Sequence, residues 1–344
     1  EGGGGGGGCA PPSGRASFEI SLGPAPGTIV VSGGTAPDRL PADMYEYNIY
    51  KREWRRVVFE RGQEAAEAFL RVYGHSLTAW AGGMVGFGGS NGTEYFNRAV
   101  RMDFQRMTCE WIQTTGPAPS ERYKHQAFVH EDRLWVLGGG NFRPGPGAAD
   151  VHALGLHTRE WRPVECSGPL PCGRVAHTLA YDPPHEAGGN GGGGHSGPPS
   201  LLRAAAAYVW GGFDARLARL DDFHRLDLGT RVWTQVRTAP GPGATPGRRA
   251  FHASFLHGAK FWIFGGADGT TRFGDLWSYT LRASPPSLAV LAARAPNLAQ
   301  LATPVATPAD GRSRAGSTFL AGSMDSLASS LAERFSIRSR ASSA

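Results

Sequence analysis

An Arg-x-x-His motif recurs along this chain of 344 residues. Its copies are Arg122-Tyr123-Lys124-His125, Arg174-Val175-Ala176-His177 and Arg249-Ala250-Phe251-His252, and Arg71 lies one residue out of frame before His75. Planar, permanently charged guanidinium groups in a sheltered concavity are suited to bidentate capture of a carboxylate. The motif therefore predicts a partner-binding site with a guanidinium lining. The alternative is that the arginines form salt bridges with neighbouring loops. The predicted site residues are Arg71, Arg122, Arg174 and Arg249.

The histidines that end these motifs are the second group that could do chemistry. We favour a structural role for them, in which each ring hydrogen-bonds from an inner strand to an adjacent loop, over metal binding or catalysis. No segment resembles a nucleophile elbow, a phosphate-cradling loop or a metal-ligand cluster. The sequence therefore predicts a non-catalytic binding module without metal or cofactor.

A repeat places these motifs in a fold. A diglycine ends an apolar run five times, and after the first four pairs a tryptophan follows 20 to 22 residues beyond the second glycine. The diglycines begin at Gly33, Gly88, Gly138, Gly211 and Gly265, and the tryptophans are Trp54, Trp111, Trp161 and Trp233. A period of about 50 residues with one Gly-Gly and one Trp is typical of an all-β fold, the β-propeller of the kelch kind, with one four-stranded blade per repeat.

One unit shows the four strands that a blade needs. The expected strands cover residues 74–80, 84–87, 98–103 and 109–112. Glycines at the end of the second strand allow positive φ and close approach of a neighbouring backbone. A tryptophan on the outer strand, such as Trp111, would fill the widening gap between neighbouring blades.

The repeats divide the chain into segments. A Gly/Pro-rich stretch is expected over 1–15, followed by a propeller over 16–284 with repeats at 16–58, 71–115, 119–165, 171–237 and 246–284. The fourth repeat contains a flexible insertion over 183–200. After the propeller we expect a short amphipathic helix within 285–301 and a disordered tail rich in Ser, Ala and Arg over 302–344.

The fifth repeat lacks its tryptophan, because Pro286 stands at the position where one is due. With Pro285 beside it, this segment lacks two backbone donors and cannot form an outer strand inside a sheet. We therefore expect a fragment of a longer protein, with at least a closing strand and a whole first blade, which would be a sixth repeat, outside these residues.

Composition limits the partners and the compartment. The formal charge of +6 is modest and scattered, which argues against nucleic acid, and no apolar run approaches the roughly 18 residues that span a membrane. The cysteines are Cys9, Cys109, Cys166 and Cys172, and they show no CxxC spacing. Free thiols indicate a reducing compartment, so we expect a cytoplasmic or nuclear protein.

Three stretches resemble a particular kelch family. They are residues 121–125 (ERYKH), 134–140 (LWVLGGG) and 157–161 (HTREW), and the segment Pro-Asn-Leu-Ala-x-Leu after the last repeat agrees with them. Together they resemble the kelch domain-containing protein 10 family. That resemblance implies a substrate receptor of cullin-type ubiquitin ligases, whose propeller captures the C-terminal residues of substrates and whose helix docks on elongin C.

The resemblance assigns the docking box to the segment after the propeller. Ser287, Leu288 and Ala292 match the start of the family's elongin-binding helix, whereas Pro296 stands where that helix would continue. Its implied partners are a peptide with a free C-terminal carboxylate, elongin B/C and a cullin. The competing hypothesis is a kelch scaffold that binds a signalling or cytoskeletal protein without a ligase. A copper radical oxidase is a third hypothesis, and no cysteine lies at a strand end with the tyrosine and histidine partners that it requires.

Overall fold

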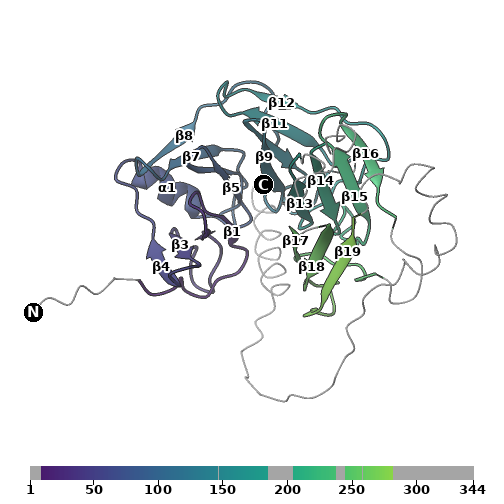
Figure 1. Cartoon of the computed structure of the whole chain (residues 1–344), viewed down its shortest axis with the longest axis horizontal. Helices are drawn as coiled ribbons and strands as arrows, with labels where there is room; N and C mark the ends of the chain where they lie inside the picture. Colours follow the sequence, from purple (N-terminus) through teal and green to yellow (C-terminus); the bar gives the residue numbers. More distant parts are fainter. Residues whose placement is uncertain (1–8, 146, 185–203, 238–244, 258, 282–344) are drawn as a thin grey trace, which may run out of the picture. The chain divides into compact units, whose positions relative to one another are not determined.

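The five diglycine repeats form five antiparallel sheets in the computed structural model of the chain (Figure 1). The structure describes residues 9–145, 147–184, 204–237, 245–257 and 259–281. Each sheet is one blade of a β-propeller, as the repeat predicted. Four blades have four strands, and the fifth has three within the described residues.

The strands of every blade follow one another in chain order. Blade 1 contains β1 (Glu19–Leu22), β2 (Thr28–Ser32), β3 (Met44–Asn48) and β4 (Glu53–Arg56). Blade 2 contains β5 (Ser76–Trp80), β6 (Gly83–Phe87), β7 (Ala99–Asp103) and β8 (Thr108–Ile112). Blade 3 contains β9 (Gln126–His130), β10 (Arg133–Leu137), β11 (Val151–Gly155) and β12 (Trp161–Pro163). Blade 4 contains β13 (Thr178–Asp182), β14 (Ala206–Trp210), β15 (Phe223–Asp227) and β16 (Val232–Gln235). Blade 5 contains β17 (Ala253–His257), β18 (Lys260–Phe264) and β19 (Leu276–Thr280). The strands expected in the second repeat differ from those of blade 2 by one or two residues at their ends.

The diglycines allow each blade to approach the next. Gly138 and Gly139 both have positive φ, and the Gly139 amide donates to the Arg174 carbonyl of the following blade at 2.9 Å. A Cβ on Gly138 would lie 2.8 Å from the imidazole of His177, which is closer than side chains tolerate. These glycines are therefore required both for the turn and for contact with the next blade.

Two of the four repeat tryptophans fill the space between blades, as the sequence predicted for all four. Trp161 and Trp233 are fully buried, and the Trp161 ring lies 5.0 Å from that of Phe87 in the preceding blade. Trp54 and Trp111 are only half-buried. The packing of the tryptophan therefore differs between the first two blades and the next two.

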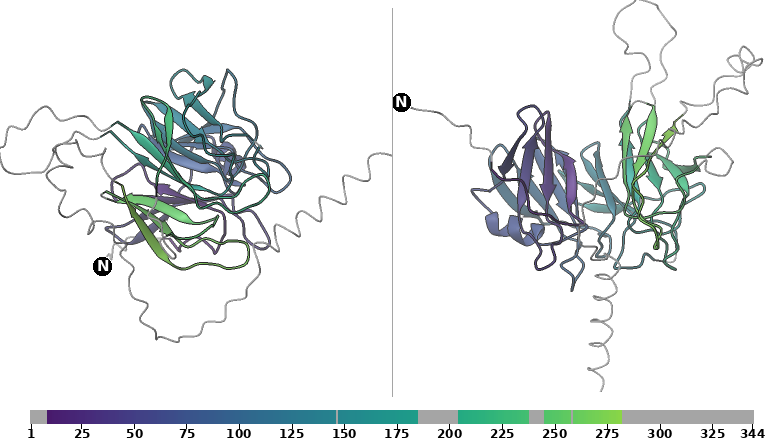
Figure 2. Two further views of the ribbon diagram at one scale, coloured as in Figure 1. Left: turned by 90° about the vertical axis from the view of Figure 1, so that its right-hand side faces the viewer. Right: turned by 90° about the horizontal axis from the view of Figure 1, so that it is seen from below.

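A short helix, α1 (Gln63–Leu70), joins blades 1 and 2 and was not predicted. Figures 1 and 2 show it against the purple and blue sheets. Its buried Phe69 packs 6.2 Å from the Trp111 ring, and Gly86 leaves room for it, because a Cβ there would lie 2.3 Å from the phenyl ring. The apolar spacing of Ala66, Phe69 and Leu70 was the available sequence signal.

The inner strands β1, β5, β9, β13 and β17 contact one another in that order. Just before each of them lies one residue with left-handed backbone, and these residues are Ser17, Gly74, Lys124, Ala176 and Phe251. Each amide after the first donates to the carbonyl of the residue before it in this set, at N–O distances of 2.7 to 3.1 Å. We call this chain of four hydrogen bonds the backbone arc. It links all five blades through their inner ends.

Several predicted segments lie outside the described residues. They are residues 1–8, most of the insertion at 183–200, and residues 282–344, which include the expected helix at 285–301 and the tail at 302–344. In the part of the chain that the structure describes, no helix has the length and apolar character needed to cross a membrane.

Candidate functional site

The three arginines of the repeated motif lie inside the blades. Arg122, Arg174 and Arg249 are 2%, 0% and 1% exposed. Each guanidinium forms a bidentate ion pair with an aspartate of its own blade. The Nη1–Oδ1 and Nη2–Oδ2 distances are 2.9 and 2.7 Å for Arg122 with Asp150, 2.8 and 2.7 Å for Arg174 with Asp222, and 2.6 and 3.1 Å for Arg249 with Asp275.

Each of these guanidinium groups makes a further contact that explains its position. Nη1 donates to the carbonyl of the first glycine of the diglycine, at 2.8 Å for Gly138, 3.1 Å for Gly211 and 2.9 Å for Gly265. One buried side chain thus fixes the end of the second strand and the start of the third. Bidentate pairs of this kind are geometrically specific, and a buried charge requires such a partner.

Two of the aspartates, Asp222 and Asp275, have pKa values below the ordinary value and are held in the ionised form. Burial alone would raise the pKa of Asp222, but hydrogen bonds from His224 and Arg174 and the charge of Arg174 bring it well below its ordinary value. The structure thus shows the salt bridges that the sequence left open as the alternative. Carboxylate binding by Arg122, Arg174 and Arg249 stays a prediction, and any ligand would have to compete with an aspartate already in place.

Blade 1 contains the same pair, which the sequence analysis missed. Arg15 forms an ion pair with Asp43, and its Nη1 donates to the Gly33 carbonyl at 3.1 Å. Arg15 stands three residues before Phe18 instead of a histidine. The motif therefore needs its arginine and its aspartate, whereas the histidine is dispensable.

Blade 2 departs from this arrangement at both positions. The first glycine of each diglycine donates its amide to the carbonyl of the residue that carries the aspartate, and in blade 2 the Gly88 amide donates at 3.1 Å to Arg98. Arg98 thus occupies the aspartate position. Val72, three residues before His75, occupies the arginine position and is buried. The pair is replaced as a whole in this blade.

Arg71, the fourth predicted arginine, does not join the others. It is exposed at the end of α1, where its backbone amide donates to the Glu67 carbonyl at 3.0 Å. The extra residue before His75, visible in the sequence, shifts it out of the blade. Its predicted contact with a partner stays a prediction.

Arg98 is a cation that the sequence analysis did not single out. Its guanidinium lies 4.3 Å from the Phe96 ring centroid and 4.7 Å from that of Trp111. The side chain is exposed, and it forms no ion pair with any residue that the structure describes. Stacking on two aromatic rings holds the group in place while its hydrogen-bond donors stay available.

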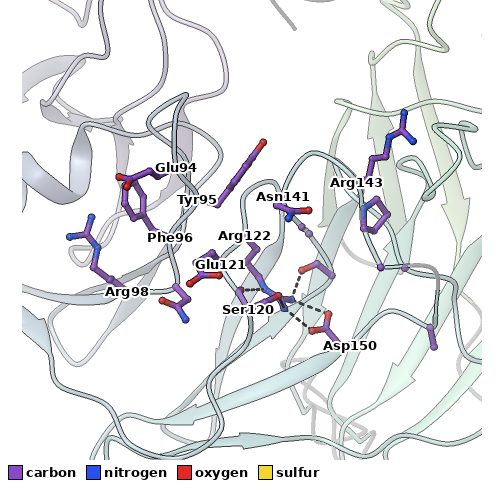
Figure 3. A pocket seen from close by; sticks show the side chains of 18 residues that line it. Glu94, Tyr95, Phe96, Arg98, Ser120, Glu121, Arg122, Asn141, Arg143 and Asp150 are labelled. Atoms are coloured by element: carbon purple, nitrogen blue, oxygen red, sulfur yellow. Dashed lines mark hydrogen bonds and ion pairs between the residues drawn. The ribbon is translucent and has the colours of Figure 1, made fainter. Parts of the chain in front are cut away.

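Arg98 borders a pocket between the loops of blades 2 and 3, with a cavity volume of about 1020 Å³ (Figure 3). In Figure 3, Arg98 lies beside Phe96, and the exposed Arg143 lies on the opposite side of the pocket. Glu94 and Glu121 also line it, and the Arg122–Asp150 pair lies within its wall. The pocket therefore offers both cationic donors and carboxylate acceptors, which suits a peptide.

Three of the four histidines make structural hydrogen bonds, although their partners are strand residues of the preceding blade and not the adjacent loop that was predicted. Their Nε2 atoms lie within 2.8 to 2.9 Å of a hydroxyl, in the pairs His75 with Ser32, His125 with Ser76, and His252 with Thr178. His177 has no such partner among the described residues. Burial lowers the pKa of His75 and of His252 to about 3, so both rings are neutral at neutral pH.

A further cation lies at the inner ends of the blades. Burial lowers the pKa of Lys124 to about 8, and the carboxylate of Glu19 opposes that shift. Burial in turn raises the pKa of Glu19 to about 8. Lys124 and Glu19 therefore interact with each other, and Lys124 is less available to a ligand than Arg98.

The remaining predictions concern metals, thiols and the docking box. In residues 9–145, 147–184, 204–237, 245–257 and 259–281, no group of three or more metal-ligating side chains comes together. All four cysteines are free thiols, as expected. The predicted elongin-contacting residues Ser287, Leu288 and Ala292 lie outside the described residues.

Comparison with known proteins gives the family. A family model described as the KLHDC2/KLHL20/DRC7 Kelch-repeats domain matches residues 8–183 and 200–303. Kelch domain-containing protein 10 of Xenopus laevis is 26% identical over 261 residues, covering 73% of this chain and 57% of that protein. The human protein of the same name is 25% identical over 273 residues, covering 74% of this chain and 56% of that protein.

A plant protein is also similar over a shorter stretch. Acyl-CoA-binding domain-containing protein 4 of Arabidopsis thaliana is 28% identical over 213 residues, covering 48% of this chain and 30% of that protein. The chain thus spans less than two thirds of the length of these relatives. Five sheets with the diglycine and tryptophan repeat, together with a family model that matches most of the sequence, show that this chain belongs to the Kelch-repeat family of β-propellers.

Proposed function

We propose that this propeller is the substrate receptor of a cullin-type ubiquitin ligase and that it binds a peptide in the pocket beside Arg98. A kelch-repeat propeller is a protein-interaction module. The ligase chemistry would belong to its partners, and the chain itself would be non-catalytic. This role would place the protein in the cytoplasm or nucleus, where free thiols are stable.

The observation that carries the proposal is the state of Arg98 in blade 2, a cation with no ion-pair partner among the described residues. Four blades contain a buried arginine neutralised by aspartate, whereas Arg98 is exposed, stacked on aromatic rings and next to a pocket. A guanidinium in this state can bind a free C-terminal carboxylate through two parallel hydrogen bonds. Arg143 can supply a second cation, and Glu94 and Glu121 can accept hydrogen bonds from peptide amides.

The ligase part of the proposal rests on the family resemblance. By that resemblance, residues 287–301 would dock on elongin C, starting at Ser287 and Leu288, and would connect the propeller to elongin B/C and a cullin. The same resemblance supports a substrate with a free C-terminus. The scaffold hypothesis differs because it requires neither contact.

The test measures peptide binding and elongin capture separately. A peptide library with free C-termini and an amidated twin library are titrated against the full chain and against the Arg98→Ala/Arg143→Ala variant. Arg162→Ala is the matched control, because Arg162 is exposed in blade 3 but does not line the pocket. We expect binding of free C-termini only, lost in the double variant and kept in the control.

A parallel pull-down scores elongin C with the full chain and with Leu288→Asp. Capture that Leu288→Asp abolishes would support the receptor. Peptide binding without elongin capture would favour the non-ligase scaffold. Equal binding of free and amidated peptides, or equal binding by the double variant, would overturn the assignment of the pocket.

A further inference from the structure

The loops that join the second strand to the third in blades 4 and 5 each carry an arginine at the same place. Arg219 forms an isolated β-bridge with Phe213, and Arg272 forms one with Ala267, in each case with the residue that follows the diglycine. In both loops the amide after the arginine donates to the carbonyl of the second glycine, at 2.9 Å in blade 4 and 2.8 Å in blade 5. The two arginines therefore occupy equivalent positions in neighbouring blades.

Arg219 is held on an aromatic surface. Its Cζ lies 5.1 Å from the ring centroid of Phe213 and 6.0 Å from that of Phe251. Its Nη1 donates to the Leu217 carbonyl at 3.2 Å, whereas no described residue accepts from Nε or Nη2. Nη2 reaches blade 5, because a Cβ on Gly269 would lie 3.9 Å from it. Stacking and one backbone contact thus fix the guanidinium and leave donors unused.

The acidic residues of these two loops do not neutralise Arg219. Apart from the aspartates of the buried pairs, the loops contain Asp214, Asp221 and Asp268. Asp268 accepts three hydrogen bonds within its own turn at 2.7 to 2.9 Å, and Asp214 accepts two backbone amides of its own loop at 2.9 Å. Asp221 lies 3.8 Å from Arg248. Arg219 and its counterpart in blade 5 therefore form no ion pair with any residue that the structure describes.

Phe251 is the exposed ring of this surface. The backbone arc gives five residues a left-handed backbone, and only in blade 5 is that residue aromatic. Its side chain is 42% exposed, and Nζ of Lys124 lies 5.6 Å from its ring centroid. Lys124 has a pKa of about 8, so it is charged at neutral pH. Two cations thus lie next to one exposed phenyl ring, which gives a surface of positive potential with an apolar centre.

Blade 2 has the same loop position without a charge. Tyr95 forms the equivalent β-bridge with Ser90, and its ring lies 5.2 Å from that of Tyr123. An aromatic residue therefore satisfies the packing at this position. The charge of Arg219 is not required for the fold of the loop, so the arginine is available for a contact outside the chain.

We propose that Arg219, Arg272 and Phe251 bind an anionic side chain of a protein partner, either the carboxylate of Asp or Glu or a phosphate on Ser, Thr or Tyr. Arginine groups recognise acidic and phosphorylated segments through bidentate hydrogen bonds, and the exposed phenyl ring would contact an apolar residue beside the anion. The site shares no residue with the pocket beside Arg98. It requires no free C-terminus, so it goes beyond the proposed function and does not depend on it.

The experiment is a fluorescence anisotropy titration of the full chain with three libraries of short peptides. All peptides are acetylated and amidated, so neither end is charged. The first library contains Asp and Glu, the second has phosphoserine at those positions, and the third has Asn and Gln. We expect one of the anionic libraries to bind about tenfold more tightly than the amide library, as a charge-assisted hydrogen bond predicts. The tighter of the two identifies the source of the anion.

Variants locate the site. Arg219→Tyr introduces the residue that blade 2 has at this position, so it removes the charge and keeps an aromatic contact. Arg272→Ala removes an exposed side chain and leaves the core intact. Each should abolish the preference for anionic peptides. Arg133→Ala is the control, because Arg133 is exposed and forms no ion pair among the described residues, and it lies at the first turn of blade 3, at the opposite end of the strands.

The outcomes separate this site from the pocket. Arg98→Ala should keep the preference for anionic peptides whether or not free C-termini bind to the pocket. Equal binding of all three libraries would overturn the proposal. An undiminished preference in both Arg219→Tyr and Arg272→Ala would overturn it as well, and would assign Arg219 to the packing of its loop. Urea titration of each variant shows that it is folded.

Discussion

Blade 2 differs from the other four blades in the residues that connect the diglycine to the start of the third strand. In blades 1, 3, 4 and 5 a buried arginine ties the diglycine to an aspartate at the start of the third strand. In blade 2 a buried valine, Val72, replaces the arginine, and Arg98 replaces the aspartate. Both members change together because either one alone would leave an unpaired charge against the interior. Arg98 therefore does not take part in a buried ion pair, whereas the aspartates at the same position of the other blades do.

The largest expected effect comes from breaking a buried pair. Arg174→Ala should lower the free energy of unfolding by about 3–5 kcal/mol, because it leaves Asp222 half-buried without its guanidinium and removes the bond to Gly211. Urea titration followed by tryptophan fluorescence measures the change. Arg162→Ala breaks an exposed pair with Glu160 and should cost no more than about 1 kcal/mol. If Arg174→Ala lowered the free energy of unfolding as little as the control does, the pairs would not stabilise the blades.

The blades themselves were predictable because their signals are local. A diglycine needs positive φ and close approach, and a tryptophan at a fixed distance needs a neighbouring sheet, so spacing alone was enough to place four blades. The helix α1 was missed because it is only eight residues long and falls between two repeats. The apolar residues of α1 could be assigned to the core only from the structure, in which Phe69 packs against Gly86 and Trp111.

The second prediction introduces into blade 2 the arginine–aspartate pair that the other four blades contain. Val72→Arg alone should cost about 3 kcal/mol, because it buries a charge that faces another arginine. Adding Arg98→Asp should recover about 2–3 kcal/mol, since the new pair repeats that of Arg122 and Asp150. A double-mutant cycle by urea titration gives the coupling free energy. Additive effects of the two changes would show that the two blades differ in more than this pair.

The third prediction concerns pH. Burial lowers the pKa of His252 to about 3, so the folded state stays neutral while the unfolded state binds a proton below the ordinary value of 6.5. Stability from this group is complete above pH 6.5 and is lost as the pH falls from 6.5 toward 3. At pH 5 the loss is about 2 kcal/mol. His252→Gln, which cannot bind a proton, should make the decline from pH 7 to pH 5 shallower by that amount in urea titrations. An unchanged decline would mean that His252 is protonated in the folded state.

The candidate site was less predictable than the fold, and for a physical reason. The sequence shows an arginine but does not show its aspartate, which lies 26 to 48 residues away in the three motifs. In the sequence alone, a repeated arginine therefore predicts a ring of donors, whereas in the structure its regularity comes from a repeated salt bridge. Arg98 could not be singled out from the sequence, because the aspartate position that it occupies is defined by strand pairing in the structure.

The smallest expected effect on stability belongs to Arg98→Ala, and it is the most informative about function. Arg98 is exposed and bound to Phe96 and Trp111 through its guanidinium face, so its removal should cost only about 0.5 kcal/mol of unfolding free energy. Loss of a charge-assisted hydrogen bond to a peptide carboxylate should weaken binding by about tenfold or more. Urea titration and peptide titration on the same variant compare the two effects. A large loss of stability with unchanged binding would assign Arg98 to the fold, whereas the expected result separates the cation of blade 2 from the four that hold their blades together.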